Sequence, residues 1–403
     1  MDTKIINQIK DIASTIEPEL IDFRRDLHMH PELSGEEVRT AGRIAAALRN
    51  IPGMQVTEHL SIGTGVTGIL RGNGGDGKCV MLRADIDALP VEEMTDVPFK
   101  STYPGKMHAC GHDAHATWLL GAARILGSMR DCFSGTIKFV FQPAEERIGG
   151  AYDYIHKDRI LDNPQVDAAF AAHAWPAVEA GRIGIAAEYP FGCAGKFSVT
   201  FIGKGGHGSW PYKARNPITA AVQFCQTAPD IVANKLDSVE PRVISVCSIH
   251  AGEPGISNII PDTCLVEGTA RATDPAILEK IGIELERAAN AISMMHGIDY
   301  QAEIKMKGKP VHNDPDLVAL VRSCAGEIVG DDRAYIMNKK HLGGEDFSLY
   351  SELAPSCYFF AGIAAPEDDE TPDLHSPYFK LHEGVISTVS QTLALSALEF
   401  LEM

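Results

Sequence analysis

Short, largely apolar runs of residues recur along this chain and constrain its fold more than any other feature. They cover residues 79–82, 136–141, 166–172 and 357–361, and stretches with helical periodicity, such as 116–129, separate some of them. A strand with apolar side chains on both faces belongs in a sheet that is covered on both sides, as parallel sheets are. The alternation of such strands with helices predicts an α/β fold with a mixed, largely parallel sheet flanked by helices.

Two helices are predicted ahead of the first buried strand. Apolar residues recur every three or four positions from Ile5 to Leu27, which predicts the first helix. A second helix is predicted to follow Glu37, because Ser34 and Glu37 have the spacing of a capping box. In a capping box, the two side chains bond to backbone N–H groups at the helix start.

The middle of the chain follows a different pattern. Phe197, Val199 and Phe201 alternate with polar residues, which predicts a strand with one face in water. A helix over 217–236, strands over 242–249 and 263–271, a helix over 275–295 and a strand over 300–307 complete the order βαββαβ of a ferredoxin-like module. We therefore predict a domain over 192–307 that is inserted between two parts of a larger domain, 1–191 and 308–403.

Composition narrows the class of protein. The 403 residues exceed what one hydrophobic core usually supports, which agrees with two domains. A net charge of -18, from 54 acidic and 36 basic residues, argues against nucleic acid or an anionic membrane as the partner. Because no signal-peptide pattern and no membrane-length apolar run is visible, and the cysteines are scattered, we expect a reduced, cytoplasmic protein. The acidic stretch 366–370 is expected to be a solvated loop.

Ionisable side chains follow the predicted buried strands at the points where these strands end. In an open α/β sheet, ligands bind beyond the carboxyl ends of the strands, so these side chains are expected to meet at one edge. In chain order they are Asp85, Asp87, Glu145, Glu146, His173 and His375. Adjacent carboxylates such as Glu145 and Glu146 can divide the work of hydrolysis, one holding a metal and the other accepting a proton.

A cluster of metal-binding residue types lies just before a predicted helix, in the sequence HACGHDAH of residues 108–115. Thiolate and imidazole suit zinc and similar divalent ions. Gly111 lets Cys110 and His112 converge on one centre, and a helix N-terminus favours the thiolate form of a cysteine. The cluster therefore predicts a metal site, with a capped helix start or a reactive thiol as the alternatives.

Eight motifs of this sequence resemble those of the aminoacylase and carboxypeptidase-like metallohydrolases. They are LRADIDALP, MHACGHDAHA, FQPAEE, HAWP, GGHGSWP, SNIIPD, GGEDFS and LHSP, in that order. The branch that looks most similar is the N-acyl-amino-acid amidohydrolases, which include hippurate hydrolases and plant auxin-conjugate hydrolases. The resemblance implies a catalytic α/β domain with an inserted lid or dimerisation domain, two divalent metal ions per subunit (zinc, manganese, nickel or cobalt) and a homodimer. The implied reaction is hydrolysis of the amide bond of N-acetyl, N-benzoyl or similar amino acids.

The resemblance also implies a ligand set, in which a cysteine replaces the bridging aspartate of other branches. The implied metal ligands are Cys110, His112, Glu146, His173 and His375. Glu145 matches the general base, and Asp87 matches an aspartate that orients a ligand. Asp85 stands where other branches carry a ligand histidine, so whether Asp85 or Asp87 contacts a metal stays open.

Four further matches fall outside the metal site. His207 matches a histidine that in the family reaches the active site of the partner subunit. Asn258 and Arg271 match residues that help to bind the carboxylate end of the substrate, and Gly344 matches a backbone position near the substrate. Apart from the resemblance, His207 could be a turn residue among glycines, and Arg271 a surface charge.

Three other functions fit part of the sequence. A cysteine hydrolase would use Cys110 as nucleophile and His112 or His115 as base, but it would leave Glu145 and Glu146 without a role. A dipeptidase or carboxypeptidase on the same scaffold would need a pocket for a free α-amino group, and N-acetyl-diaminopimelate deacetylase is a specific alternative within the branch. A non-catalytic binding protein would not need the proposed base, Glu145, in addition to all five implied metal ligands, which argues against this alternative.

Overall fold

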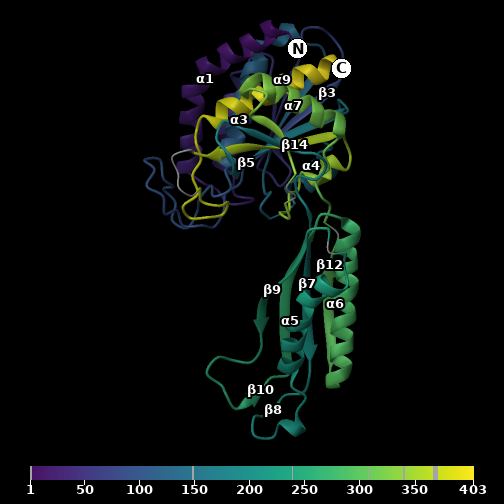
Figure 1. Ribbon diagram of the computed structural model, residues 1–403. Helices are drawn as coiled ribbons and strands as arrows, with labels where there is room; N and C mark the ends of the chain where they lie inside the picture. Colours follow the sequence, from purple (N-terminus) through teal and green to yellow (C-terminus); the bar gives the residue numbers. More distant parts are fainter. Residues whose placement is uncertain (1, 148, 238, 307, 339–340, 366–370) are drawn as a thin grey trace. The chain divides into compact units, whose positions relative to one another are not determined.

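The computed structural model describes residues 2–147, 149–237, 239–306, 308–338, 341–365 and 371–403 (Figure 1). The chain divides into two compact units. The first comprises Met1–Pro190, Val311–Lys339 and Asp346–Met403, and the second comprises Phe191–Pro310 and Lys340–Glu345. Residue 307, where the inserted domain was predicted to end, and the predicted acidic loop 366–370 lie outside the described residues.

A mixed sheet of eight strands forms the centre of the first unit, in the order β1-β2-β4-β3-β5-β14-β6-β13. The strands are β1 (Gln55–Leu60), β2 (Gly65–Arg71), β3 (Cys79–Asp85), β4 (Thr136–Gln142), β5 (Ala168–Glu179), β6 (Ile183–Ala186), β13 (Ala334–Met337) and β14 (Ser356–Ala364). The neighbours β4, β3, β5 and β14 run parallel, whereas β1, β2 and β6 add antiparallel pairs. The four apolar runs of the sequence form this parallel centre, which confirms the predicted mixed sheet.

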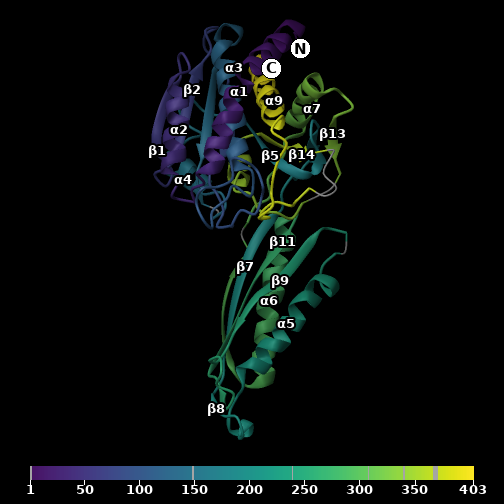
Figure 2. The same ribbon diagram turned by 90° about the vertical axis from the view of Figure 1, so that its left-hand side faces the viewer.

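Helices cover the sheet, and three of them pack on one another over its central strands. These three are α1 (Thr3–Met29), α3 (His112–Ser128) and α9 (Val385–Glu402), which lie side by side in Figures 1 and 2. The other helices of this unit are α2 (Val38–Arg49), α4 (Gly150–His156), α7 (Pro315–Val329) and α8 (Ser348–Ser351). Every residue of β3 and β4 is buried, as expected for strands that are covered on both faces.

The second unit is built on a four-stranded antiparallel sheet with the strand order β12-β7-β11-β9. Its elements are β7 (Cys193–Ile202), α5 (Pro217–Asn234), β9 (Arg242–His250), β11 (Thr263–Ala272), α6 (Pro275–His296) and β12 (Asp299–Lys305). This chain order confirms the predicted βαββαβ module. Phe197 and Phe201 of β7 pack against Phe224 of α5, so the apolar face of that strand faces a helix. A two-stranded pair, β8 (Gly206–His207) with β10 (Ile259–Ile260), completes the unit.

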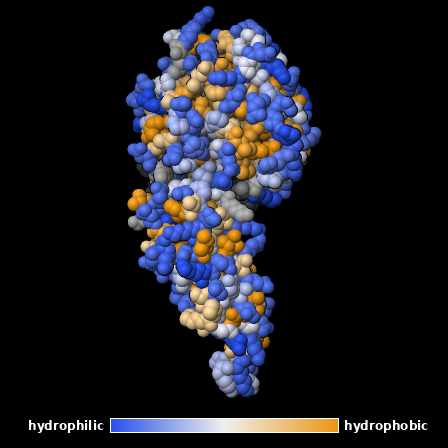
Figure 3. Space-filling model, turned by 90° about the vertical axis from the view of Figure 1, so that its right-hand side faces the viewer, coloured by the Kyte–Doolittle hydropathy of each residue, from blue (hydrophilic) through white to orange (hydrophobic). Residues whose placement is uncertain are grey.

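The surface carries mostly polar side chains. On the face seen in Figure 3, hydrophilic residues separate small apolar patches. Among the described residues, no helix has both the length and the apolar character that crossing a bilayer requires. All nine cysteines carry free thiols.

Candidate metal centre

Cys110 and His112 reach the site from a tight turn at the start of α3. Gly111 between them has φ +88°, a left-handed conformation that glycine adopts without strain. His112 is the first residue of α3, so the turn lets a residue before the helix and one inside it face the same point. Cys110 Sγ lies 3.5 Å from His173 Nε2.

His173 lies within a strand rather than at its end. The prediction that the strand ends at this residue is wrong, because β5 continues to Glu179. Its register with β14 explains the extra length: His173 pairs with Phe360, and the pairing goes on beyond it. His173 and Pro176 interrupt the apolar run, so the run alone did not show the full strand.

Among the described residues, five groups of candidate ligands are close enough together to hold a metal ion, and two of these groups share Cys110. Cys110, His112 and His173 place their ligand atoms within 4.8 Å of one another. The ligand atoms of Cys110, Glu146 and His375 are equally close. The members of the first group are buried, whereas Glu146 is partly exposed and His375 is exposed. Two groups with one shared thiol are what two neighbouring metal ions with a common ligand require.

Two buried ligand atoms lack hydrogen bonds. His112 Nε2 and Glu146 Oε1 have no hydrogen-bond partner among the residues that the structure describes. These two atoms lie 3.9 Å apart, and Glu146 Oε1 is 3.4 Å from His375 Nε2. Buried polar atoms without a partner are uncommon in native proteins, and a cation beside each of these atoms would satisfy it. The residues therefore fit a divalent metal ion.

Burial sets the protonation of the groups around Cys110. It raises the pKa of the Cys110 thiol well above its usual value and lowers the pKa of His173 well below its usual value. His173 is therefore neutral at pH 7, the form that binds metals. Its Nδ1 hydrogen-bonds to the Ala174 carbonyl at 2.7 Å, so Nε2 faces Cys110. A thiol whose pKa is raised is a weak nucleophile, which argues against the cysteine-hydrolase alternative.

Asp87 accepts four hydrogen bonds inside the first unit. The donors are His112 Nδ1 at 3.2 Å, the backbone N–H groups of Glu145 at 3.2 Å and Glu146 at 3.1 Å, and Ser34 Oγ at 2.6 Å. Burial by itself would raise the pKa of Asp87, but these donors outweigh it and lower that pKa. One carboxylate thus orients the ring of His112 and the backbone of the glutamate pair.

The predicted capping box at the start of α2 is wrong. Glu37 is the N-cap residue, but its side chain makes no capping hydrogen bond, and Ser34 donates to Asp87 instead. The Glu37 carboxylate accepts from Gly35 N, Thr64 Oγ1 and Ala144 N. Partners far away in the sequence replace the local ones that the motif predicts.

Asp85 is held by two donors of its own. Its Oδ1 lies 2.5 Å from His115 Nδ1, and its Oδ2 accepts from Arg83 Nη1 at 2.8 Å. His115 Nε2 in turn accepts from the backbone N–H of Ala174 at 3.0 Å. With Nδ1 donating and Nε2 accepting, His115 is a neutral ring that ties β3 to β5 beside His173. The sequence offered His115 only as a possible base of a cysteine hydrolase and not as a metal ligand.

Behind the site lies a buried polar network that sequence reasoning missed. Arg83 donates to Gln142 Oε1 at 3.1 Å and to Asp346 Oδ1 at 2.9 Å, and Gln142 Nε2 also donates to Asp346. All three side chains are buried. The arginine and the glutamine stand in strands that are mostly apolar, which is the one sequence signal of such a network.

A second buried network lies on the other side of His112. Asp113 Oδ2 is 2.8 Å from both Arg24 Nε and His28 Nδ1, and His28 Nε2 is 3.3 Å from Glu93 Oε1. Burial would raise the pKa of Asp113, but Arg24 and His28 outweigh it and lower that pKa. The network ties α1 to the first turn of α3, which carries His112.

The other predicted residues lie in the second unit. His207 lies in β8, and Asn258 lies just before β10. The two are brought together because Gly208, the residue after His207, donates its N–H to the Asn258 carbonyl at 2.8 Å. Both His207 and Asn258 are exposed. Arg271 lies at the opposite end of β11, half-buried, and lines a pocket of about 460 Å³. Gly344 belongs to the same unit but to a separate segment of the chain.

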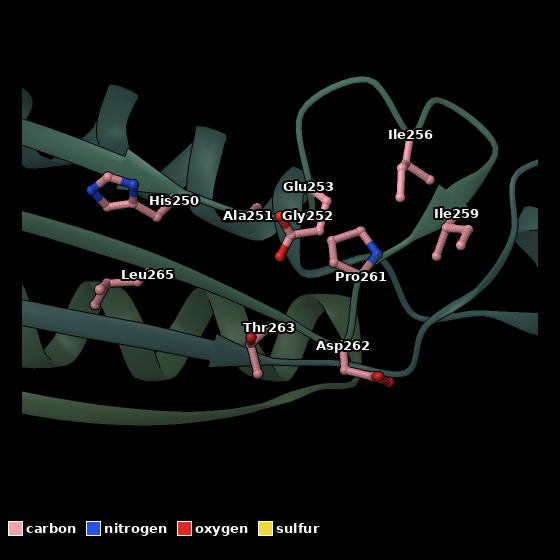
Figure 4. Close-up of a pocket in the computed structure, with 10 residues that line it drawn as sticks. All are labelled: His250, Ala251, Gly252, Glu253, Ile256, Ile259, Pro261, Asp262, Thr263 and Leu265. Carbon is pink, nitrogen blue, oxygen red and sulfur yellow. The ribbon is translucent and has the colours of Figure 1, made fainter.

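A pocket of about 550 Å³ lies between the end of β9 and the β8–β10 pair (Figure 4). His250, Glu253 and Asp262 contribute its polar groups, and Ile256, Ile259 and Leu265 its apolar side chains. None of the predicted site residues is among those that line it. The pocket is nevertheless close to two of them, because its lining residue Ile259 follows Asn258 and pairs with His207.

Comparison with protein families agrees with this geometry. The model of peptidase family M20/M25/M40 matches residues 81–399, a span from β3 to α9 that contains all five proposed ligands. The chain belongs to this family. The predicted resemblance to aminoacylase and carboxypeptidase-like metallohydrolases is thereby confirmed, and the protein is an M20 family hydrolase.

Proteins with different activities are similar to this M20 chain over nearly its whole length. Thermostable carboxypeptidase 2 of Saccharolobus solfataricus is 35% identical over 98% of this chain and 99% of its own. N-acetylcysteine deacetylase of Bacillus subtilis is 34% identical over 95% of this chain and 97% of its own. The crystal structure of a dinuclear metal-binding peptidase of the M20 family from Bacillus subtilis superposes with a TM-score of 0.82, at 30% identity over 97% of this chain and 99% of that one.

Proposed function

We propose that this M20 hydrolase cleaves the amide bond of N-acyl amino acids and releases a carboxylic acid and a free amino acid. The observation that carries the proposal is the pair of candidate ligand groups around Cys110 with Glu145 beside them. A carboxylate oxygen of Glu145 lies within 4.8 Å of a ring nitrogen of His112 and of a carboxylate oxygen of Glu146. The similarity to N-acetylcysteine deacetylase supports this substrate class. The proposal covers N-acetyl and N-benzoyl groups, and N-acetyl-diaminopimelate is one substrate within the class.

In this proposal, Cys110, His112 and His173 hold one divalent ion, and Cys110, Glu146 and His375 hold a second. Zinc, manganese, nickel and cobalt all suit a thiolate with histidines and a carboxylate. When bound, the ions supply Lewis acidity, which polarises an amide carbonyl and lowers the pKa of water. Asp85 and Asp87 already accept two and four hydrogen bonds, so we assign both to the positioning of histidines rather than to the metals.

Glu145 is proposed as the general base. It is 7% exposed, so it lies at the border of the interior, and Asp87 holds its backbone N–H. Glu145 would accept a proton from the attacking water and later donate it to the leaving amine.

We propose that His207 stabilises the oxyanion in the active site of a partner subunit, and that Asn258, Arg271 and Gly344 bind the carboxylate end of the substrate. Assembly as a cytoplasmic homodimer is part of the proposal, and light scattering of the purified protein tests the dimer.

The direct test compares Glu145→Ala with wild type on a panel of N-acetyl amino acids, N-benzoyl amino acids and dipeptides, after loading with each candidate metal. We expect full metal content and a loss of kcat of at least about 10²-fold, because general-base catalysis contributes roughly that much or more. Glu279→Ala, which removes an exposed glutamate of α6, serves as the matched control. Substantial turnover by Glu145→Ala would contradict the assignment of the base.

Carboxypeptidase or dipeptidase activity is the second candidate, because a carboxypeptidase is similar over nearly the whole chain. It predicts higher kcat/KM for unblocked dipeptides than for acyl amino acids. The same panel decides between the two, since each dipeptide can be compared with its N-acetyl counterpart. Activity that survives exhaustive chelation but not thiol alkylation would instead favour a cysteine hydrolase.

A further inference from the structure

The loop that follows β4 presents three consecutive backbone N–H groups to buried carboxylates. Ala144 N donates to Glu37 Oε1 at 3.0 Å, and the N–H groups of Glu145 and Glu146 donate to the two oxygens of Asp87. The backbone that carries the proposed base, Glu145, and the proposed ligand, Glu146, is therefore hydrogen-bonded to two buried carboxylates. Asp87 matches a known family position, whereas Glu37 has no assigned role.

Ala144 has a conformation that needs such support. Its φ is +56°, in the left-handed region that alanine rarely adopts, and the residue is buried. A residue in this region persists only where its surroundings hold it there, and functional sites are the usual places. If Ala144 relaxed to negative φ, the chain direction after it would change, and the side chains of Glu145 and Glu146 would move.

Glu37 is suited to hold this residue, because its side chain is not used to cap its own helix. Its side chain is fully buried, although α2 begins at the next residue and receives no capping bond from it. Gly35 N at 2.9 Å and Thr64 Oγ1 at 2.7 Å both donate to Oε2, which fixes the carboxylate and leaves Oε1 aimed at Ala144. A buried acceptor with three donors from three segments is a rigid support.

We propose that Glu37 is a positioning residue, which fixes Glu145 and Glu146 by holding Ala144 in the left-handed conformation. The inference rests on the proposed function only in giving the two glutamates their roles as base and ligand. The contact itself is a property of the fold. It can therefore be tested through turnover and, independently of activity, through amide hydrogen exchange in the loop.

The principal variant is Glu37→Gln, which keeps the shape of the side chain. An amide offers one acceptor oxygen and one donor group, and we expect the oxygen at the Oε2 position, where it accepts from both Gly35 N and Thr64 Oγ1, so that an N–H faces Ala144 N. We expect kcat to fall by about 10²-fold with KM nearly unchanged, because a displacement of about 1 Å of a catalytic group has that effect. Metal affinity, measured by competition with a chelator, should fall, and amide hydrogen exchange over residues 142–147 should become faster.

Ala144→Gly provides the rescue, because glycine adopts positive φ without strain. In the Glu37→Gln background it should restore at least about tenfold in kcat, and in the wild-type background it should change kcat little. Glu32→Gln is the matched control: it alters a part-buried glutamate that accepts from Arg39 N and Thr40 N at the start of α2, and not from Ala144. That variant should keep the wild-type kcat and the wild-type exchange over 142–147.

Glu37→Gln with unchanged kcat and unchanged exchange over 142–147 would overturn the inference. A fall in kcat that Ala144→Gly does not reverse, with exchange as in wild type, would also overturn it. Should Glu37→Gln fail to fold, Glu37→Asp, which retracts the carboxylate by one methylene, replaces it with the same expected results. If the wild type hydrolysed no acyl amino acid or peptide, the proposed function would fail, while exchange and metal affinity would still decide the role of Glu37.

Discussion

The two units of this chain hold their proposed functional residues in different surroundings. In the first unit, His112 and the Glu145–Glu146 backbone are bound by the buried carboxylate of Asp87, and His115 joins β3 to β5 beside His173. In the second unit, His207 and Asn258 are exposed on a short two-stranded pair. Most of the first set is fixed in the interior of a single unit, although His375 is exposed, whereas His207 and Asn258 lie at a surface.

This difference separates two tasks. Metal ligands and a general base must be held to within a fraction of an ångström, which buried acceptors achieve. Residues that contact a variable substrate can lie at a surface and be ordered when the substrate binds. We therefore expect substitutions in the first unit to change metal binding, stability and kcat, and those of Asn258 and Arg271 in the second unit to change KM. A substitution of His207, the proposed oxyanion group, should lower kcat.

The largest effect is expected from Cys110→Ala. This change removes the ligand that both groups share, so both proposed sites would lose a ligand at once. We expect loss of bound metal and of detectable turnover, measured by elemental analysis and by the substrate panel. Cys324→Ala, at another buried cysteine, is the control and should keep its metal. Full metal content in Cys110→Ala would remove the basis for the shared ligand.

Asp113→Asn is expected to have the next largest effect, on stability. The folded-state pKa of Asp113 is lowered, so its contribution to the free energy of unfolding is present above the unfolded-state pKa of about 3.9 and is lost as the pH falls through and below that value. Removing one partner of a buried ion pair costs about 3 kcal/mol. Urea unfolding should show this deficit at pH 7 and a smaller one near pH 3. An equal deficit at both pH values would contradict the ionised pair.

A smaller effect, on metal affinity, is expected from Asp87→Asn. The amide would still accept from some donors, but it would place an N–H against the Glu145 or Glu146 N–H or against His112. Loss of such a partner of a ligand typically weakens metal binding by about 10- to 100-fold. Chelator competition measures it, and unchanged affinity would show that Asp87 does not orient His112.

The smallest effect is expected from Arg271→Ala in the second unit. If Arg271 binds the carboxylate of the substrate, KM should rise by about tenfold, because a charge-assisted hydrogen bond is worth about 1.5 kcal/mol or more. Metal content and the unfolding transition should match wild type. Lys305→Ala, which lines the same pocket, is the control. A loss of metal in Arg271→Ala would break the separation of tasks between the units.

Periodicity in the sequence predicted most of the fold. The apolar runs at β3, β4, β5 and β14 and the alternation in β7 were sufficient for the mixed sheet and for the ferredoxin-like module. Strand ends were less predictable, since β5 continues past His173 where its pairing with β14, rather than its own residues, keeps it extended.

Side-chain partners in the site could not be predicted in the same way. Ser34 and Glu37 have the local spacing of a capping box, yet Asp87 and Ala144, which lie far along the chain, take their hydrogen bonds. His115 and Asp346 also find partners only through the fold. The ligand residues were visible because cysteine, histidine and paired glutamates at strand ends are unusual, whereas the groups that hold them are ordinary acids, amides and hydroxyls.

Anomalous X-ray diffraction from crystals of the metal-loaded protein tests the central claim most directly. The account predicts two metal peaks, one among Cys110, His112 and His173 and one among Cys110, Glu146 and His375, with the Cys110 sulfur between them. A single peak, or a peak at Asp85 and His115 in place of these, would contradict it.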